Sequence, residues 1–168
     1  RNITCKMAEL VRDTIVSAVG LLSEFNEDVA LEVEKNEGIV DQYEDKLGSY
    51  LVKLSCEPMT EQDSNETNKL LHLIGDFERI SDHAVNIMVS AEEISDKKLT
   101  FSPEAQRELQ IMSDAVCEIL DLAAGGDVAV DEHAAQVALG ILDHDGLHQA
   151  VGILEGLDNA LPGDQGAQ

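Results

Sequence analysis

Pairs of carboxylates spaced four residues apart are the feature of this sequence that most directly suggests chemistry. Side chains at positions i and i+4 lie on the same face of a helix, so two carboxylates at this spacing can grasp one hard cation. The chain contains five Glu-x-x-x-Asp pairs: Glu9 with Asp13, Glu24 with Asp28, Glu37 with Asp41, Glu78 with Asp82, and Glu92 with Asp96. Because chance placement of so many acids would give about two such pairs, spacing alone does not identify a site.

Two of these pairs stand in informative surroundings. On the second expected helix, five acids lie opposite the apolar stripe, which is typical of a solvated face as well as of a cation site: Glu34, Glu37, Asp41, Glu44 and Asp45. Glu78 and Asp82 instead interrupt a row that otherwise holds only glycine and apolar residues, namely Leu71, Gly75, Val85 and Val89. Solvation explains an acidic pair in an apolar row less well, so this pair is the stronger candidate.

Histidines and other reactive residues offer weaker candidates. His144 and His148 have a spacing that can chelate zinc, but no third strong ligand accompanies them, and an exposed polar face is the favoured interpretation. His72 and His83 stand alone on long helices and are expected to be packing or ion-pair partners. The chain contains no nucleophile elbow, no phosphate-binding glycine-rich loop and no Cys/His dyad signature. We therefore expect no catalytic residues and no enzymatic activity.

Apolar residues at spacings of three and four predict four helices that carry these side chains. The helices are expected over about residues 2–24, a segment that ends near residue 55, a segment with the apolar stripe 70–94, and residues 103–124. Thr60 or Ser64 is expected to cap the third helix and Ser102 the fourth, because hydroxyls accept hydrogen bonds from free amides. Long helices with short connections bury their stripes only by packing together. The expected fold class is therefore all-α, an antiparallel long-helix bundle.

The stripes also predict which residues form the core. The first helix is expected to bury one face, which begins at Ile3. On the second helix a seven-residue repeat predicts the seam: Val33, Val40, Leu47 and Leu54, with Tyr43 and Tyr50 between them. Phe77 lies in the middle of the third stripe.

The charge of the chain limits its partners. Lys and Arg number 11 against 34 Asp and Glu, which gives a net charge of -23. Such a field repels phosphate backbones and anionic lipid headgroups, so we expect no binding to nucleic acid or directly to a membrane surface. Cations and basic protein surfaces are the natural partners. No apolar run reaches the roughly eighteen residues of a membrane span. Three cysteines without CxxC spacing, Cys5, Cys56 and Cys117, predict reduced, buried thiols and a cytoplasmic location.

The character of the chain changes beyond Gly125. No Lys or Arg follows Arg107, and short alanine-rich amphipathic segments at about 128–142 and 147–161 are interrupted by glycines, which weaken helices. The composition of residues 162–168 is typical of a disordered tail. These features predict less regular helices after Gly125 and a tail over residues 162–168.

One segment of the third helix resembles a known family. Residues 76–87, DFERISDHAVNI, are similar to the signature of PhoU-type domains, which are three-helix repeats of phosphate-transport regulators and of the cytoplasmic ends of bacterial sodium-dependent phosphate cotransporters. Residues 37–54, EGIVDQYEDKLGSYLVKL, resemble the cotransporter branch more than the free-standing regulator. The resemblance covers about residues 1–122.

The resemblance implies an all-α fold of two three-helix repeats whose acidic motifs hold metal ions, iron or zinc among them. Its motifs fall on Glu37 with Asp41 and on Glu78 with Asp82. It also implies a cytoplasmic regulatory module that meets a transporter membrane domain or a second copy of itself, and that can take up phosphate through bound metal. The resemblance further implies a three-helix repeat over residues 1–100 and a partial or divergent second repeat over 101–161, because beyond Ala124 the chain departs from the family pattern and no second ERISDH-like run follows.

Two alternatives come from other functional classes. A metal-free helical interaction module would turn the acidic face toward a basic protein partner. A carboxylate-bridged metalloenzyme would require Glu-x-x-His pairs that face the core, and the chain has none. The second alternative is therefore disfavoured, and the first stays open.

Overall fold

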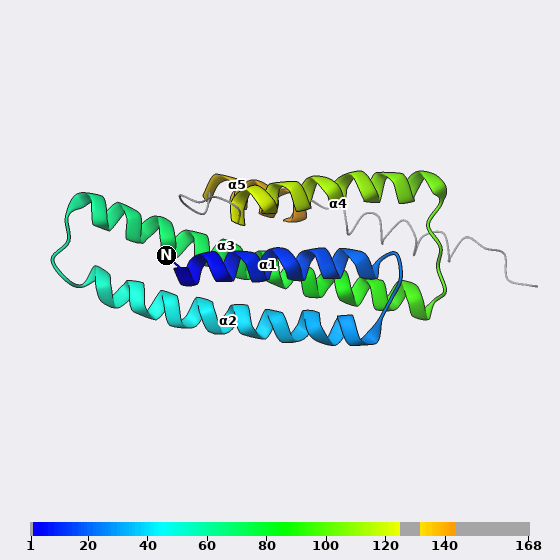
Figure 1. The fold of residues 1–168 in the computed structure, drawn as a ribbon, viewed down its shortest axis with the longest axis horizontal. Coiled ribbons are helices and arrows are strands. Elements are labelled where there is room, and N and C mark those ends of the chain that lie inside the picture. Colours follow the sequence, from blue (N-terminus) through cyan, green and yellow to red (C-terminus); the bar gives the residue numbers. More distant parts are fainter. Residues whose placement is uncertain (1, 125–131, 144–168) are drawn as a thin grey trace, which may run out of the picture.

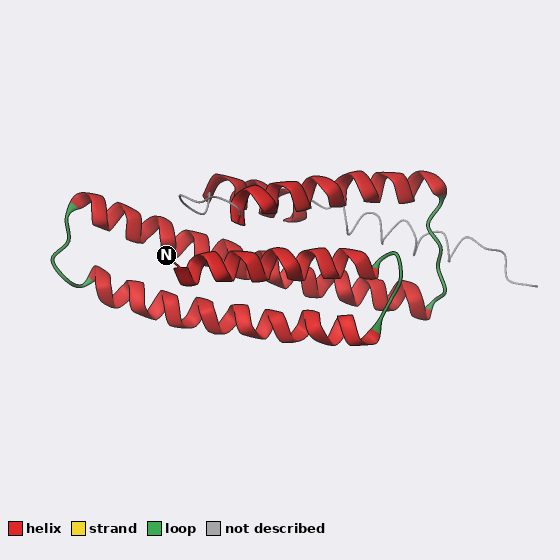
Figure 2. Ribbon diagram, in the orientation of Figure 1, coloured by secondary structure: helices red, strands yellow, loops and turns green. Residues whose placement is uncertain are grey.

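A computed structural model, which describes residues 2–124 and 132–143, shows helices joined by loops and no strand in those residues (Figure 2). The helices are α1 (Asn2–Leu21), α2 (Glu27–Ser55), α3 (Glu61–Asp96), α4 (Pro103–Ala124) and α5 (Glu132–Asp143). The first three pack along one another as an antiparallel bundle, and α4 and α5 lie against α1 and α3 (Figure 1). The prediction of four helices without a strand in residues 2–122 is confirmed.

The helices begin where the sequence predicts capping side chains. Thr60 forms a capping box with Asp63 at the start of α3, and each side chain bonds the other residue's backbone amide. Ser102 Oγ accepts a hydrogen bond of 3.2 Å from the backbone amide of Ala105 at the start of α4. Asn26 caps α2 in the same way, accepting from the amides of Asp28 and Val29. These caps satisfy amides that have no partner inside the helix.

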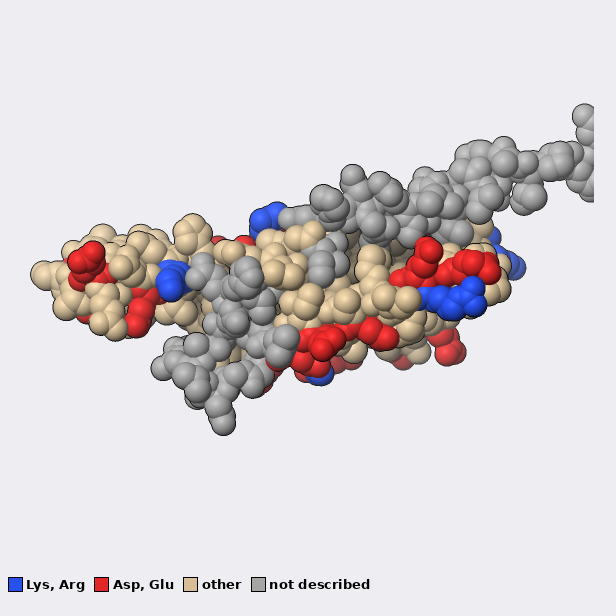
Figure 3. Space-filling view, turned by 90° about the horizontal axis from the view of Figure 1, so that it is seen from above, with Lys and Arg blue, Asp and Glu red and all other residues tan. Residues whose placement is uncertain are grey.

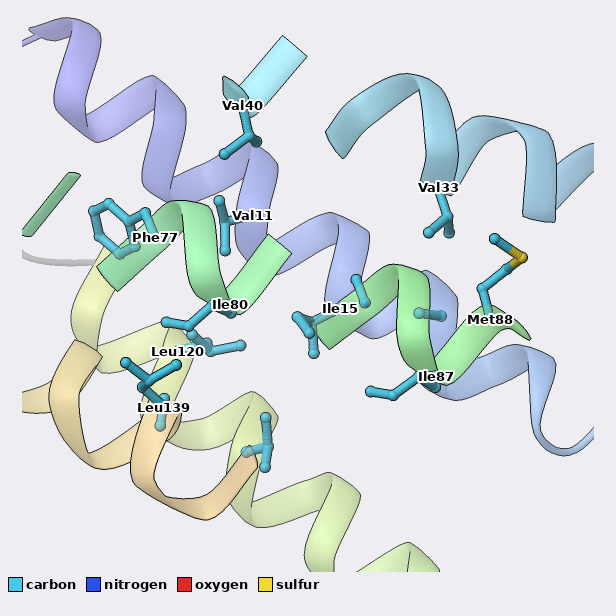
Figure 4. Close-up of a cluster of buried hydrophobic side chains, with 14 of the residues drawn as sticks. Val11, Ile15, Val33, Val40, Phe77, Ile80, Ile87, Met88, Leu120 and Leu139 are labelled. Atoms are coloured by element: carbon cyan, nitrogen blue, oxygen red, sulfur yellow. The ribbon is translucent and has the colours of Figure 1, made fainter. Parts of the chain in front are cut away.

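Buried side chains of the three long helices form one core (Figure 4). Phe77 of α3 is 1% exposed, and Val33 and Val40 of α2 are completely buried, as the apolar stripes predict. Two predicted core positions are wrong: Tyr50 is 62% exposed, with its neighbour Leu51 buried instead, and Ile3 is exposed on α1. The helix period places Leu51, rather than Tyr50, on the side of α2 that faces its neighbours.

The two later helices extend this core. Leu120 of α4 and Leu139 of α5 are buried beside Ile80 of α3 (Figure 4). An ion pair also links α4 to α1, because Arg12 Nε lies 2.6 Å from Asp121 Oδ1. The helix predicted at about 128–142 is confirmed in part by α5. The predicted segment at 147–161, the tail at 162–168, and His144 and His148 lie outside the described residues, and the division into repeats stays a prediction.

On the face that Figure 3 presents, Asp and Glu side chains form several groups, Lys and Arg side chains lie at a few scattered places, and other residue types separate them. Within the described part of the chain, no helix has the length and apolar character that crossing a bilayer requires. The three cysteines are free, but the expectation that all are buried is wrong, because Cys56 is exposed. It follows the last residue of α2, where the chain leaves the bundle.

Candidate functional site

The antiparallel packing of α2 and α3 brings the two favoured carboxylate pairs to one surface. Glu37 and Glu78 are partly buried, whereas Asp41 and Asp82 are exposed. Because the helices run in opposite directions, four residues forward along α2 correspond to four residues back along α3. Glu37 and Asp82 line the same hollow between the two helices, and the charge of Asp41 acts on Glu78. We call these four residues the carboxylate patch.

The charges of the carboxylate patch act on one another across the two helices. Burial raises the pKa of Glu37, and the negative charges of Asp41, Asp82 and Glu34 raise it further. Burial likewise raises the pKa of Glu78, and Asp82, Asp41 and Glu44 add to the effect while Arg79 opposes it. The influence of Asp82 on Glu37 and of Asp41 on Glu78 shows that the patch is one electrostatic unit drawn from two helices.

The position of the acids on α2 differs from the prediction. Glu37 and Glu44 do not lie on a solvated outer side but share a seven-residue row with Ala30 and Leu51, which are 8% and 7% exposed. Only the other three acids of the predicted face are fully exposed: Glu34, Asp41 and Asp45. The physical reason is that α2 packs against both α1 and α3, so its buried face is wider than one apolar stripe.

A shallow hollow marks one end of the patch. Its walls are Glu34 and Glu37 of α2 and Asp82, Val85 and Asn86 of α3. Carboxylate and amide oxygens thus surround a solvent-open space between the helices. Oxygen donors of this kind suit hard cations.

The remaining Glu-x-x-x-Asp pairs do not form comparable sites. Glu24 lies beyond the end of α1 and Asp28 lies in the first turn of α2, so this pair does not share a helix. Both Glu9 and Asp13 are exposed, and Asp13 pairs with Arg12 at 2.8 Å. Glu92 and Asp96 are exposed on the last turns of α3.

The side chains of the patch are not gathered into a finished cage. Among residues 2–124 and 132–143, no three or more His, Cys, Asp or Glu side chains are clustered closely enough to hold a metal ion. Mutual repulsion favours such spreading in the absence of a cation, because like charges that approach raise the free energy of the ionised state. The donor set nevertheless fits a hard cation, since all four side chains offer only carboxylate oxygen.

The other candidates give no second site. His72 is exposed and His83 is partly buried, each on α3. A larger cleft of about 700 Å³ lies between α1, the end of α3 and α4, with Cys117 in its wall. Burial raises the pKa of the Cys117 thiol, and the charge of Asp121 adds to this effect. A raised thiol pKa lowers the share of the reactive thiolate, so this cleft is a weaker candidate than the carboxylate patch.

Comparison with protein families gives one result that bears on this surface. The family model described as PhoU domain matches residues 4–91, which is more than half of the 168-residue chain. The match spans most of α1, all of α2 and most of α3, and it includes all four residues of the carboxylate patch. No curated protein and no solved structure matches the chain.

Proposed function

The chain belongs to the PhoU domain family, and on that basis we propose that it is a regulatory module of phosphate transport that binds a metal ion at Glu37, Asp41, Glu78 and Asp82. The family is regulatory rather than enzymatic. We propose that the module is part of a sodium-dependent phosphate cotransporter. The alternative is that it is a free-standing regulator of phosphate uptake. In either setting the module acts at the cytoplasmic face of a membrane.

The observation that carries this proposal is the electrostatic coupling of the carboxylate patch across α2 and α3. Each helix supplies one partly buried glutamate and one exposed aspartate. The charge of the aspartate on the opposite helix raises the pKa of each glutamate. Four carboxylates in one patch bind a cation more strongly than one pair does, because more oxygen ligands and more negative charge act together. An oxygen-only donor set favours ferric iron over zinc, which prefers nitrogen and sulfur ligands in structural sites.

The charge of the patch also connects metal to phosphate. Without a cation, the carboxylates repel any phosphate that approaches α2 and α3. A bound cation supplies positive charge to which phosphate can coordinate. In this proposal Glu37 and Glu78 hold the ion from the helix interface, and Asp41 and Asp82 hold it from the solvent side. The packing surface of the module meets the transporter membrane domain or a second copy of the chain.

Removal of one carboxylate pair at a time tests the proposal. The protein is stripped of metal, reloaded with ferric or zinc ion, and its metal content is measured by elemental analysis. We expect both Glu37→Gln/Asp41→Asn and Glu78→Gln/Asp82→Asn to abolish uptake, because both helices hold the same ion. The control removes Glu92 and Asp96, which have the same spacing on the same helix but lie outside the patch. If the control loses as much metal as the other two variants, the ion is not held at the patch.

The alternative is a metal-free interaction module, and the open arrangement of the described carboxylates favours it. In that case the acidic surface of α2 and α3 would bind a basic protein segment. The same titration separates the two functions, because a metal-free module takes up no ion in the wild type. Binding of a basic peptide that weakens with added salt, together with absent metal uptake, would support the alternative.

A further inference from the structure

The cleft between α1, the end of α3 and α4 has walls that are almost free of charge. Among the described residues that line it, only Asp114 carries a charge, although the whole chain has a net charge of -23. Leu99, Phe101 and Leu109 in its wall are only partly buried, and Val16 is 40% exposed. A groove of this kind suits the apolar face of an amphipathic helix better than an ion or a phosphate.

The cleft continues the path of α5. Residues 125–131 join α4 to α5, and so short a connection makes α5 run back along α4 (Figure 1). Leu139 of α5 lies beside Leu120 of α4 (Figure 4). Four residues further on, α5 ends at Asp143, which antiparallel packing places near the level of Cys117. Because Cys117 lines the cleft, the chain leaves α5 at the inner end of the cleft.

The sequence beyond α5 carries an apolar stripe of matching length. Five apolar residues recur at strict spacings of three and four, the period of one helix face: Leu147, Ala150, Leu154, Leu157 and Leu161. As a helix, residues 147–161 would be about 22 Å long, and the wall that α4 contributes to the cleft, residues 106–117, is about 17 Å long. Only residues 144–146 separate the stripe from α5, so the segment starts at the cleft.

We propose that residues 147–161 bind this cleft as an amphipathic helix and turn their apolar stripe toward α1, α3 and α4. The tether to α5 makes this binding intramolecular, which gives the chain's own segment an advantage over any free partner. Gly152 and Gly156 fall on the side opposite the stripe and weaken the helix when it is isolated. The segment therefore becomes helical on binding, and the cleft is closed only while the segment is docked. This inference does not depend on the proposed metal binding.

Hydrogen exchange of the full chain, followed by mass spectrometry, tests the inference from the side of the segment. In the wild type we expect the amides of residues 147–161 to exchange at least about tenfold more slowly than they do in denaturant. Leu154→Asp/Leu157→Asp should remove this protection, because it places carboxylates in an apolar cleft. The matched control, Gln149→Asp/Asn159→Asp, adds the same charge away from the stripe and should keep the protection.

A second pair of variants tests the inference from the side of the cleft. Val16→Asp adds a carboxylate to the wall and should also remove the protection of residues 147–161, while exchange in α2 stays as in the wild type. Val52→Asp is the matched control, since Val52 is 55% exposed on α2 and does not line the cleft. Cys117 gives an independent measurement: its alkylation should be faster in Val16→Asp than in the wild type, whereas alkylation of the exposed Cys56 should not change.

Three results would overturn the inference. Residues 147–161 of the wild type could exchange as fast as in denaturant, which would mean that the segment does not dock. Protection that survives Val16→Asp, or that is lost equally in Gln149→Asp/Asn159→Asp, would mean that the segment binds elsewhere or by another face. Protection that falls on dilution would assign the cleft to a second copy of the chain. None of these results bears on metal uptake at the carboxylate patch, so this inference and the proposed function fail separately.

Discussion

Neutralising one half of the carboxylate patch should leave the metal-free protein at least as stable as the wild type. Glu78→Gln with Asp82→Asn keeps the size of both side chains, so packing along α3 is preserved. Glu78 is partly buried, and its pKa is raised by burial first and then by Asp82 and Asp41. A raised carboxyl pKa means that the charged form is less stable in the folded chain than in the unfolded chain. Removing that charge at pH 7 therefore relieves repulsion.

Metal should reverse the order of stability. A ligand that binds only the folded state adds RT ln(1 + [L]/Kd) to the free energy of unfolding, which is about 2.7 kcal/mol at a hundredfold excess over Kd. For a chain of this size each kcal/mol corresponds to roughly 2–4 °C in melting temperature, so the wild type should gain about 5–11 °C. The double variant should gain nothing from metal, because only Glu37 and Asp41 remain.

The assay is thermal unfolding, followed by circular dichroism at 222 nm, with and without ferric or zinc ion. Glu92→Gln with Asp96→Asn is the matched control, since both residues are exposed on the same helix. Without metal this control should change stability by less than about 0.5 kcal/mol and should keep the full metal increment. Equal metal increments in the wild type and in the Glu78/Asp82 variant would refute the reasoning.

Three further predictions concern pH, packing and one helix end. Because the pKa values of Glu37 and Glu78 are raised in the folded chain, these two side chains bind more protons in the folded than in the unfolded chain once the pH exceeds the ordinary glutamate pKa of 4.5. Their contribution to stability therefore falls as pH rises from there through the raised values, and the Glu37→Gln/Glu78→Gln variant should lose this part of the pH dependence of melting. In urea unfolding, Phe77→Ala should cost about 3–5 kcal/mol because Phe77 is buried, whereas Leu47→Ala should cost only about 2 kcal/mol because Leu47 is partly exposed; equal costs would contradict the assigned burial. Lys98 has a φ of 54° after the end of α3, so Lys98→Gly should raise the free energy of unfolding by about 1 kcal/mol, and a loss of stability would contradict this explanation.

The helices and most of the core could be predicted from the sequence because they depend on local periodicity. The stripe that contains Phe77 has strict three-and-four spacing, and most of the buried positions of α3 belong to it. Thr60 and Ser102 are found at helix starts because capping needs only neighbouring residues. Spacing alone gives five pairs, and the apolar surroundings favour Glu78 with Asp82, but only the family resemblance singles out this pair together with Glu37 and Asp41.

The sides of a helix that face two different neighbours could not be predicted from one apolar stripe. Glu37 and Glu44 look like outer residues when α2 has a single seam, but α2 touches both α1 and α3. The burial of Ser81 was not predicted for the same reason, because serine on a long helix is usually exposed. A signal was available in the sequence: Ile74, Ser81 and Met88 fall seven apart, which marks a second row on α3 beside the stripe of Phe77.

The row of Ala30, Glu37, Glu44 and Leu51 on α2 links stability to the proposed function. The two ends of the row, Ala30 and Leu51, are apolar and almost completely buried. This is what a row would need if its only role were to pack one helix against another. Its two middle positions hold acids, both of them partly buried. These acids weaken the metal-free bundle, since burial disfavours their charged form. Residues that break local packing rules at one place, while their neighbours obey them, are expected where a site is built. Glu37 belongs to the carboxylate patch, and the charge of Glu44 raises the pKa of Glu78 in it, so in the proposed function a bound cation would offset the cost of both charges.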